Sequence, residues 1–324
     1  MPVLREPIPH VYVSLQELAA LKHAGKSFTF LPRQPVTSLL SGRRASRLRG
    51  RGLTFEEMRL YHQGDDPRTI DWKATARTGE THVRVYTEER ERPSLLVVDQ
   101  RLSMFFGSRR DMKSVTAARA AALAAWRIVS VGDRVGAVVF NDRDTVEIKP
   151  QRSDRHVMRL ISAIASFNHL LDVDAQSPGD PDALNRALQI ARRLVTHDCL
   201  VTIISDFQGA DATTRKWVTE LRRHNDVLAI RVVDPLEVRR VNYMETGDPN
   251  VGPLVVSDGT LQIDVDTADE SLQSRFASEH EEVTDRMAGL SARYDVPTME
   301  LSTERDVPEQ VREILGRLPK ARRG

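Results

Sequence analysis

Short apolar runs alternate with longer amphipathic stretches along most of the chain after Pro93. Leu95–Val98 and Leu200–Ser205 are apolar at nearly every position, which is typical of strands that are buried on both faces of a sheet. The Ala- and Leu-rich stretch Asp111–Val131 is followed by Gly132, which is typical of a helix and its C-terminal end. The pattern predicts strands at 95–98, 135–140, 145–149, 200–205, 227–233, 254–257, 260–265 and 296–301, and helices at 111–131, 154–167, 182–196, 212–224, 271–294 and 308–318.

This alternation predicts an α/β fold in which a mainly parallel sheet carries helices on both faces. Only Asn141–Asp144 separates two of the strands, so the strand 145–149 should be a single antiparallel edge strand. Asp258-Gly259 predicts a turn between the two short strands that flank it. Ligands of such sheets bind beyond the carboxyl ends of the strands, where the strand order reverses. Any functional site should therefore lie there.

The change of pattern along the chain predicts that it divides into three segments. Residues 1–93 are rich in charge and lack a periodic apolar face, so we expect an irregular segment that packs on the main domain. Residues 94–302 should form that domain, with the hairpin in an insert at 236–266. Residues 303–324 should form a C-terminal helix.

Composition narrows the class of protein. Hydrophobic residues make up 40% of the chain and charged residues 29%, which is typical of a globular protein. The net charge of +1 predicts no strong field towards nucleic acid or membrane. A single cysteine, Cys199, rules out an internal disulfide, and no apolar run approaches the ~18 residues of a membrane span. Because residues 1–30 also lack the apolar core of a signal peptide, we expect a cytoplasmic protein.

The sequence lacks the strongest enzymatic signatures of α/β proteins. It contains no Gly-x-Gly-x-x-Gly after a strand, no Walker phosphate loop and no Gly-x-Ser-x-Gly elbow. Its nine histidines do not have the spacing of zinc ligands. We therefore expect no catalytic residues, no bound cofactor and no enzymatic activity.

A candidate ion site lies where two predicted strands end. One strand ends in the run Asp99-Gln100-Arg101-Leu102-Ser103, and another ends in Asp206. This arrangement resembles the metal-ion-dependent adhesion site of von Willebrand factor A domains, Asp-x-Ser-x-Ser, which holds a divalent cation through oxygen ligands. The resemblance implies a von Willebrand factor A-like sheet. The chain departs from the pattern twice, because Arg101 replaces the first serine and Asp182 stands near the position of the usual threonine.

We therefore predict a degenerate site that holds no ion. A guanidinium at ~4 Å from a divalent cation, at an effective dielectric of ~20, is repelled by roughly 8 kcal/mol. That exceeds the binding free energy of a millimolar site, about 4 kcal/mol. We expect Arg101 to act instead as an internal counter-ion for one or more of the aspartates. Binding of Mg²⁺ stays the alternative. The degenerate site comprises Asp99, Arg101, Ser103, Asp182 and Asp206.

A second constellation lies upstream. It runs through Gly50-Arg51-Gly52-Leu53-Thr54-Phe55-Glu56-Glu57-Met58-Arg59-Leu60-Tyr61, Gly64-Asp65-Asp66-Pro67-Arg68-Thr69-Ile70-Asp71-Trp72, Ala76-Arg77-Thr78-Gly79 and Tyr86-Thr87-Glu88-Glu89. These residues resemble the family called domain of unknown function 58. That resemblance implies a segment joined directly to a von Willebrand factor A-like domain. It also implies a partner, an AAA+ ATPase of the MoxR type, and we expect no membrane contact.

Two interpretations of this constellation stay open. It could be an ion-pair network that attaches the segment to the sheet, with Trp72 as an apolar anchor, or it could be a binding surface for a partner. We favour the structural network, because a segment without apolar periodicity needs polar anchoring. Its residues are Arg59, Asp65, Asp66, Arg68, Asp71, Trp72 and Arg77.

A Gly- and Arg-rich loop at residues 42–52 contains five arginines and no acid. Such a loop could bind phosphates or RNA, but without interleaved aromatic residues the evidence for nucleic acid is weak. We expect a protein contact here instead, through Arg43, Arg44, Arg47, Arg49 and Arg51.

The sequence thus favours one function over two alternatives. The favoured function is a non-enzymatic interaction module, an adaptor or assembly factor that works with a MoxR-type ATPase and possibly with other von Willebrand factor A-like proteins. The first alternative is a divalent-metal-dependent hydrolase that uses Asp99 and Asp206. The second is nucleic-acid binding through residues 42–52.

Overall fold

The computed structural model describes residues 8–25, 53–88, 93–172, 179–238, 254–257, 262–265 and 296–317. The chain divides into two compact units. The first consists of Met1–Val36 together with Arg92–Gly324, and the second of Thr37–Glu91. We call them the sheet unit and the hairpin unit. No helix in the described ranges is long and apolar enough to cross a membrane.

The sheet unit is built on a six-stranded sheet with the order β10-β7-β6-β3-β4-β5. All neighbours pair in parallel except β4 and β5, which pair antiparallel at the edge. The predicted mainly parallel sheet with one antiparallel edge strand is therefore confirmed. Its strands are β3 (Ser94–Asp99), β4 (Val135–Phe140), β5 (Thr145–Gln151), β6 (Leu200–Ser205), β7 (Asp226–Val233) and β10 (Thr298–Ser302).

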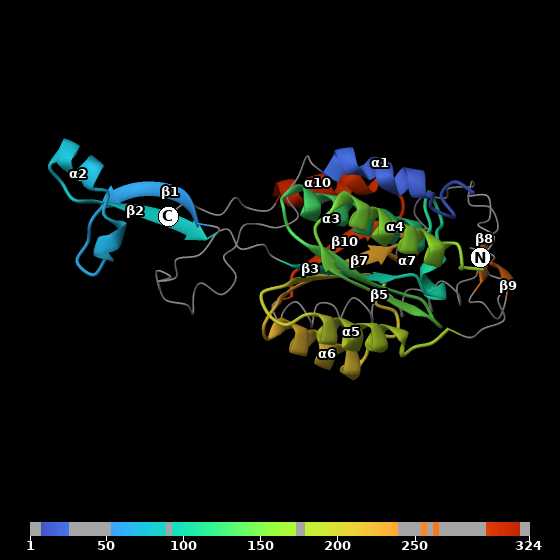
Figure 1. The fold of residues 1–324 in the computed structure, drawn as a ribbon. Helices are drawn as coiled ribbons and strands as arrows, with labels where there is room; N and C mark the ends of the chain where they lie inside the picture. Colours follow the sequence, from blue (N-terminus) through green and yellow to red (C-terminus); the bar gives the residue numbers. More distant parts are fainter. Residues whose placement is uncertain are drawn as a thin grey trace. The chain divides into compact units, whose positions relative to one another are not determined.

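Helices cover both faces of this sheet (Figure 1). The strands are apolar at successive positions, so each strand contributes to two cores. Leu96 and Val98 of β3 join one core and Leu95 and Val97 join the other. The first core is closed by α1 (Leu15–Gly25), α3 (Lys113–Ser130), α4 (Asp154–Asn168) and α10 (Val307–Arg317), and the second by α5 (Ala183–Leu194) and α6 (Ala212–Arg222).

The strand order reverses between β3 and β6. After β3 the chain continues to β4 and β5 on one side, and it then returns to place β6, β7 and β10 on the other side. The carboxyl ends of β3 and β6 therefore meet at the point where ligands of such sheets bind. The loop after β3 contains the short 3-10 helix η2 (Leu102–Met104), and β7 is followed by the short helix α7 (Pro235–Val238).

The N-terminal residues of the sheet unit are more regular than predicted. Helix α1 packs on α3 and α4, and Leu18 of α1 is fully buried. Trp126 of α3 donates a hydrogen bond from Nε1 to the carbonyl of Leu18, at 3.0 Å. Val13 and Leu18 therefore belong to the main core. The structure divides residues 1–93 between the sheet unit and the hairpin unit, whereas the sequence pattern predicted a single irregular segment.

The hairpin unit is also regular. Strands β1 (Leu53–Leu60) and β2 (His82–Glu88) pair antiparallel, and η1 (Pro67–Thr69) and α2 (Trp72–Thr78) lie between them. The expectation of an irregular segment is wrong here. A register shift between Phe55 and Glu57 breaks the alternation that would have identified β1 as a strand. The packing of this unit on the main domain stays a prediction.

The predicted hairpin near the C-terminal part of the chain is confirmed as β8 (Leu254–Ser257) paired with β9 (Gln262–Val265). The helix predicted at 271–294 lies outside the described residues.

Candidate functional site

Two buried aspartates lie at the carboxyl edge of the sheet, at the reversal of strand order. Asp99 is the last residue of β3, and Asp206 directly follows β6. Asp99 is fully buried and Asp206 is 5% exposed. Neighbouring β3 and β6 run in parallel, with Val98 opposite Ile204. Their ends therefore bring together two carboxylates that are more than a hundred residues apart in sequence.

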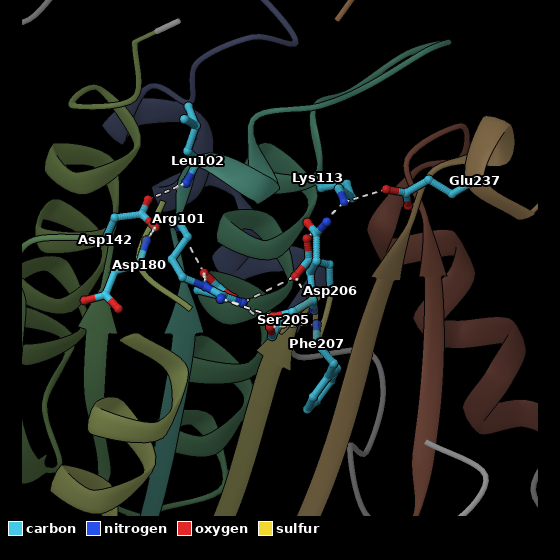
Figure 2. A network of polar contacts seen from close by, with 11 residues as sticks. Arg101, Leu102, Lys113, Asp142, Asp180, Ser205, Asp206, Phe207 and Glu237 are labelled. Carbon is cyan, nitrogen blue, oxygen red and sulfur yellow. Dashed lines mark hydrogen bonds and ion pairs between the residues drawn. The ribbon is translucent and has the colours of Figure 1, made fainter. Parts of the chain in front are cut away.

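The side chain of Arg101 lies between these carboxylates (Figure 2). Its Nη2 atom lies 2.8 Å from Oδ2 of Asp99 and 3.5 Å from Oδ1 of Asp206. Its Nε atom is 3.1 Å from each carboxylate oxygen of Asp99, and Nη1 donates to the carbonyl of Gln208 at 3.2 Å. Arg101 is itself only 4% exposed. The predicted counter-ion role is confirmed for both aspartates.

A second buried cation, Lys113, completes the site. Its Nζ atom lies 3.0 Å from Oδ2 of Asp206 and 2.7 Å from Oε1 of Glu237, which belongs to α7. Sequence reasoning missed Lys113 and Glu237. The structure begins α3 at Lys113, with no acid in its first turn, whereas the sequence pattern began this helix at Asp111 and so hid the signal. A cation at a helix N-terminus opposes the helix dipole and so indicates a nearby carboxylate.

The backbone after β6 adapts to hold Asp206 in place. Ser205 donates from Oγ to Oδ2 of Asp99 at 2.6 Å and accepts from the backbone N–H of Phe207 at 2.9 Å. Phe207 has φ of 58°, a left-handed conformation that bulky residues rarely adopt. This turn sends the Phe207 ring into the core, away from the polar groups, and lets Asp206 face the cations (Figure 2). The left-handed turn at Phe207 therefore directs its apolar ring and the charged side chain of Asp206 to different surroundings.

The protonation states of the two aspartates and the two cations depend on their burial and on the charges of their neighbours. Burial raises the pKa of Asp99, and the nearby Asp206 adds to this effect against the opposing influence of Arg101. Burial also acts to raise the pKa of Asp206, but Lys113 and Arg101 overcome it and lower that pKa to about 2. Burial disfavours the charged forms of Arg101 and Lys113, yet their carboxylate neighbours raise the pKa of both. Both cations therefore stay charged at neutral pH.

The donor set does not fit a divalent cation. Both oxygens of Asp99 already accept hydrogen bonds, Oδ1 from Arg101 and Oδ2 from Arg101 and Ser205. The guanidinium stands where the adhesion-site pattern requires a hydroxyl oxygen. Across the described ranges, no group of three His, Cys, Asp or Glu side chains is arranged to hold a metal. The structure therefore places an internal ion-pair cluster at this position.

Two residues predicted for this site do not take part in the ion-pair cluster. Asp182 is exposed at the N-terminal end of α5, and it forms no hydrogen bond or ion pair with Arg101. Ser103 lies in η2 with a buried Oγ that forms no hydrogen bond to any described residue. Neither side chain bonds to Asp99, Arg101 or Asp206, and the loop after β3 is held instead through the N–H of Leu102, which donates to Asp142 at 2.7 Å. Asp142 and Asp180 are the acids beside Arg101 here (Figure 2).

The upstream network is confirmed in part. Arg59 pairs with Asp65 through two hydrogen bonds of 2.7 Å, which helps to lower the pKa of Asp65 to about 2. Asp71 caps α2 by accepting from Lys73 and Ala74, and it pairs with Arg84, which the sequence did not single out. Asp66 caps η1.

Three members of the predicted network do not take part in its ion pairs among the described residues. Trp72 is 69% exposed, so it is not an apolar anchor within the hairpin unit itself, and its role as an anchor on the sheet stays a prediction. Arg68 and Arg77 are exposed and form no ion pair with the described residues. Trp72 is the first residue of α2, directly after the N-cap Asp71. The predicted contact residues Arg43, Arg44, Arg47, Arg49 and Arg51 lie outside the described residues.

Comparison with known proteins places the chain in a family. The model of the family described as protein of unknown function DUF58 matches residues 57–286, a range that includes most of the hairpin unit and the ion-pair cluster. The chain belongs to this family. Uncharacterized proteins of Mycobacterium bovis and Mycobacterium tuberculosis are each 31% identical to it over 284 residues, which covers 85% of this chain and 82% of theirs.

A solved structure is also similar to this DUF58 chain. It is the conserved hypothetical protein BatB of Bacteroides thetaiotaomicron, with 13% sequence identity and a TM-score of 0.41. The similarity covers 69% of this chain and 96% of that chain.

Proposed function

We propose that this DUF58 chain is a non-enzymatic protein-interaction module that works with an AAA+ ATPase of the MoxR type. The observation that supports it most directly is the occupation of the strand-reversal point by Arg101 and Lys113. In an α/β enzyme this is the position where substrate and catalytic groups meet. Here its carboxylates are bonded to internal cations instead.

The chemistry of the cluster supports the same proposal. A carboxylate acts as a general base or a metal ligand through free lone pairs. Asp99 and Asp206 already share theirs with a buried guanidinium, a buried ammonium and backbone N–H groups. Both side chains are also closed off from solvent. The cluster can stabilise the loops at the edge of the sheet, but it presents no reactive group to a substrate.

The proposal predicts direct binding to an AAA+ ATPase encoded in the same genome. The purified full-length chain, immobilised at known density, should bind the purified ATPase reversibly and with saturation in surface plasmon resonance. The control is a second sensor surface that carries the same chain after unfolding and refolding. Its circular dichroism spectrum must show that the native fold has not been recovered. The chain alone should hydrolyse neither ATP nor a p-nitrophenyl ester.

Opposite results would favour the alternatives. Hydrolysis by the chain alone, lost in Asp99→Asn with the fold retained, would replace the proposal with an enzyme. Salt-dependent binding of RNA or DNA, together with the absence of ATPase binding, would favour the nucleic-acid alternative.

A further inference from the structure

Charged groups of alternating sign form a continuous chain along the carboxyl edge of the sheet. From Asp99 it passes through Arg101, Asp206 and Lys113 to Glu237, with contacts of 2.8, 3.5, 3.0 and 2.7 Å between successive partners (Figure 2). We call it the edge chain. Each of its two cations contacts two carboxylates, so a change at one end alters the hydrogen bonds available to the other members.

Glu237 differs from the other members of the edge chain because the short helix α7 carries it. The two aspartates are fixed by strands β3 and β6, and Lys113 is fixed by the 18-residue helix α3. In contrast, α7 has four residues, and its Leu236 belongs to neither apolar core of the described residues. Among those residues, the ion pair from Glu237 to Lys113 is the polar contact that α7 makes outside its own turn. Glu237 can therefore leave the edge chain without disrupting the sheet or a core.

A second link joins α7 to the loop after β3. The fully buried carboxylate of Asp234, directly before α7, accepts from the backbone N–H of Ser108 at 2.8 Å and from Ser108 Oγ. It also accepts from the backbone N–H of Leu236 at 2.9 Å. The backbone N–H of Asp234 in turn donates to Oε2 of Glu237 at 3.1 Å. The segment between β3 and α3 is thus bonded to α7 and its turn at two points, Ser108 and Lys113.

These two links make the contacts of α7 and of the loop depend on one another. If α7 moves away, Lys113 loses one of its acceptors and the carboxylate of Asp234 loses the N–H of Leu236. If the loop moves, the same carboxylate loses both donors of Ser108. A buried charged group that has already lost some of its hydrogen bonds holds its remaining partners less firmly. Each movement therefore lowers the free energy needed for the other.

We propose that α7 is a latch that couples the segment after β7 to the loop after β3. In the closed state Glu237 contacts Lys113, and residues 100–112 are held at the strand-reversal point. A partner that draws the segment after β7 away opens α7 and this loop in one cooperative step. The end of β7 stays in place, because Thr303 after β10 still donates to Asp234 at 2.6 Å. The latch goes beyond the proposed interaction role and does not depend on it.

Hydrogen-exchange mass spectrometry of the full-length chain tests the latch. Glu237→Gln keeps the shape of the side chain but removes the charge that Lys113 contacts. Amides in residues 101–112 and 234–238 should both exchange faster, by the same factor of at least about ten, while those of β4 stay unchanged. The matched control is Glu220→Gln, which removes an ion pair with Arg223 on α6 and should leave both segments unchanged.

The reverse experiment starts from the loop. Ser108→Ala removes the hydroxyl that donates to Asp234, and it should accelerate exchange in residues 234–238 as well as in the loop, because coupling between two sites is reciprocal. Ser166→Ala is the matched control, since its hydroxyl donates within α4 to the carbonyl of Ser162. This variant also tests the latch if Glu237→Gln does not fold, which circular dichroism shows.

Three results would overturn the latch. The first is faster exchange in residues 234–238 alone after Glu237→Gln, which means that α7 frays by itself. The second is equal acceleration in β4, which means that Glu237 supports the whole fold. The third is unchanged exchange in residues 234–238 after Ser108→Ala. Binding of the ATPase is measured separately, so its absence would end the proposed function and leave these outcomes unaffected.

Discussion

Arg101 supplies a buried positive charge to the two aspartates at this edge of the sheet. A covalently attached charge does not depend on the concentration of an ion, and it carries several directed N–H donors. These donors hold Asp99, Asp206 and the carbonyl of Gln208 in one arrangement. Because the guanidinium is buried, its removal should leave a buried carboxylate without a partner and lower the stability of the fold. Two predictions at the scale of single residues follow from this cluster.

The first concerns Arg101→Ser. The change leaves Asp99 buried without its main partner, so the free energy of unfolding should fall by about 3–5 kcal/mol in urea denaturation. Calorimetry should detect no binding of millimolar Mg²⁺ or Mn²⁺ to the wild type. Either ion should restore part of the lost stability of the variant, but only part, because Lys113 remains 3.0 Å from Asp206.

The control for this variant is Arg155→Ser, which removes an exposed arginine and should change stability by less than about 0.5 kcal/mol. Tight binding of either ion by the wild type would contradict the counter-ion role of Arg101.

The second prediction concerns Lys113→Met and pH. The pKa of Asp206 is about 2 in the folded chain against 3.8 for the free side chain. A lowered pKa contributes stability that is present above about pH 4 and is lost as the pH falls towards 2, in total about 2 kcal/mol. Without Lys113 this contribution should shrink. The stability difference between wild type and variant should therefore be largest at pH 7 and smaller at pH 3.

Urea unfolding at a series of pH values measures this difference, with the exposed Lys149→Met as the matched control. A difference that stays constant from pH 7 to pH 3 would show that Lys113 does not set the protonation of Asp206.

At the scale of elements, the approach of β4 to the edge strand β5 depends on one glycine. The register shifts between Val135 and Ala137, so Gly136 faces the backbone of β5 directly. A Cβ atom built on Gly136 would lie 2.5 Å from the carbonyl oxygen of Ile148 and 2.8 Å from the nitrogen of Pro150. These are backbone atoms, which cannot rotate away. The edge strand therefore requires a residue without a side chain at this position.

The third prediction is that Gly136→Ala lowers the free energy of unfolding by about 1–3 kcal/mol, because β5 must shift to relieve the overlap. Gly179→Ala is the matched control, since a Cβ there meets nothing closer than 3.5 Å. Urea denaturation of both variants measures the effect. Equal stabilities would mean that β5 accommodates the methyl group without cost.

At the scale of the whole molecule, a buried hydrogen-bond chain joins the N-terminal residues to the functional edge of the sheet. Asn168 of α4 accepts from the backbone N–H of Val13 at 2.8 Å and donates to the side chain of Gln100 at 3.1 Å. Gln100 follows Asp99 directly and donates to the carbonyl of Ser114 at 3.0 Å. The chain thus links residues near α1 to both the loop after β3 and the start of α3.

The fourth prediction is that Asn168→Ala lowers the free energy of unfolding by about 1–3 kcal/mol, because the buried N–H of Val13 loses its acceptor. In hydrogen-exchange mass spectrometry, amides of residues 13–25 should exchange faster while those of β10 stay unchanged. Ser166→Ala, on the exposed side of the same helix, is the control. Unchanged exchange in residues 13–25 would show that other contacts alone hold α1.

Local sequence determined most of the sheet and part of the site. Apolar runs identified β3, β4, β6 and β7 because a strand buried on both faces is apolar at successive positions. The four residues between β4 and β5 allowed only an antiparallel edge pair. The predicted strand ends placed Asp99 and Asp206 at one edge, and Arg101, two residues from Asp99, was close enough in sequence to be identified as its counter-ion. In each case the information lay within a few neighbouring residues.

The tertiary structure alone decided which distant groups complete the site. Lys113, Asp142 and Glu237 come from three separate elements, and only the strand order brings them near Asp99 and Asp206. The local pattern did not predict the regularity of the hairpin unit, because a bulge interrupts the alternation of β1. It did not predict the exposure of Trp72 either. Periodicity reports whether a residue is buried. Which charge it meets there depends on the path of the whole chain, because Coulomb energy follows distance in space and not separation in sequence.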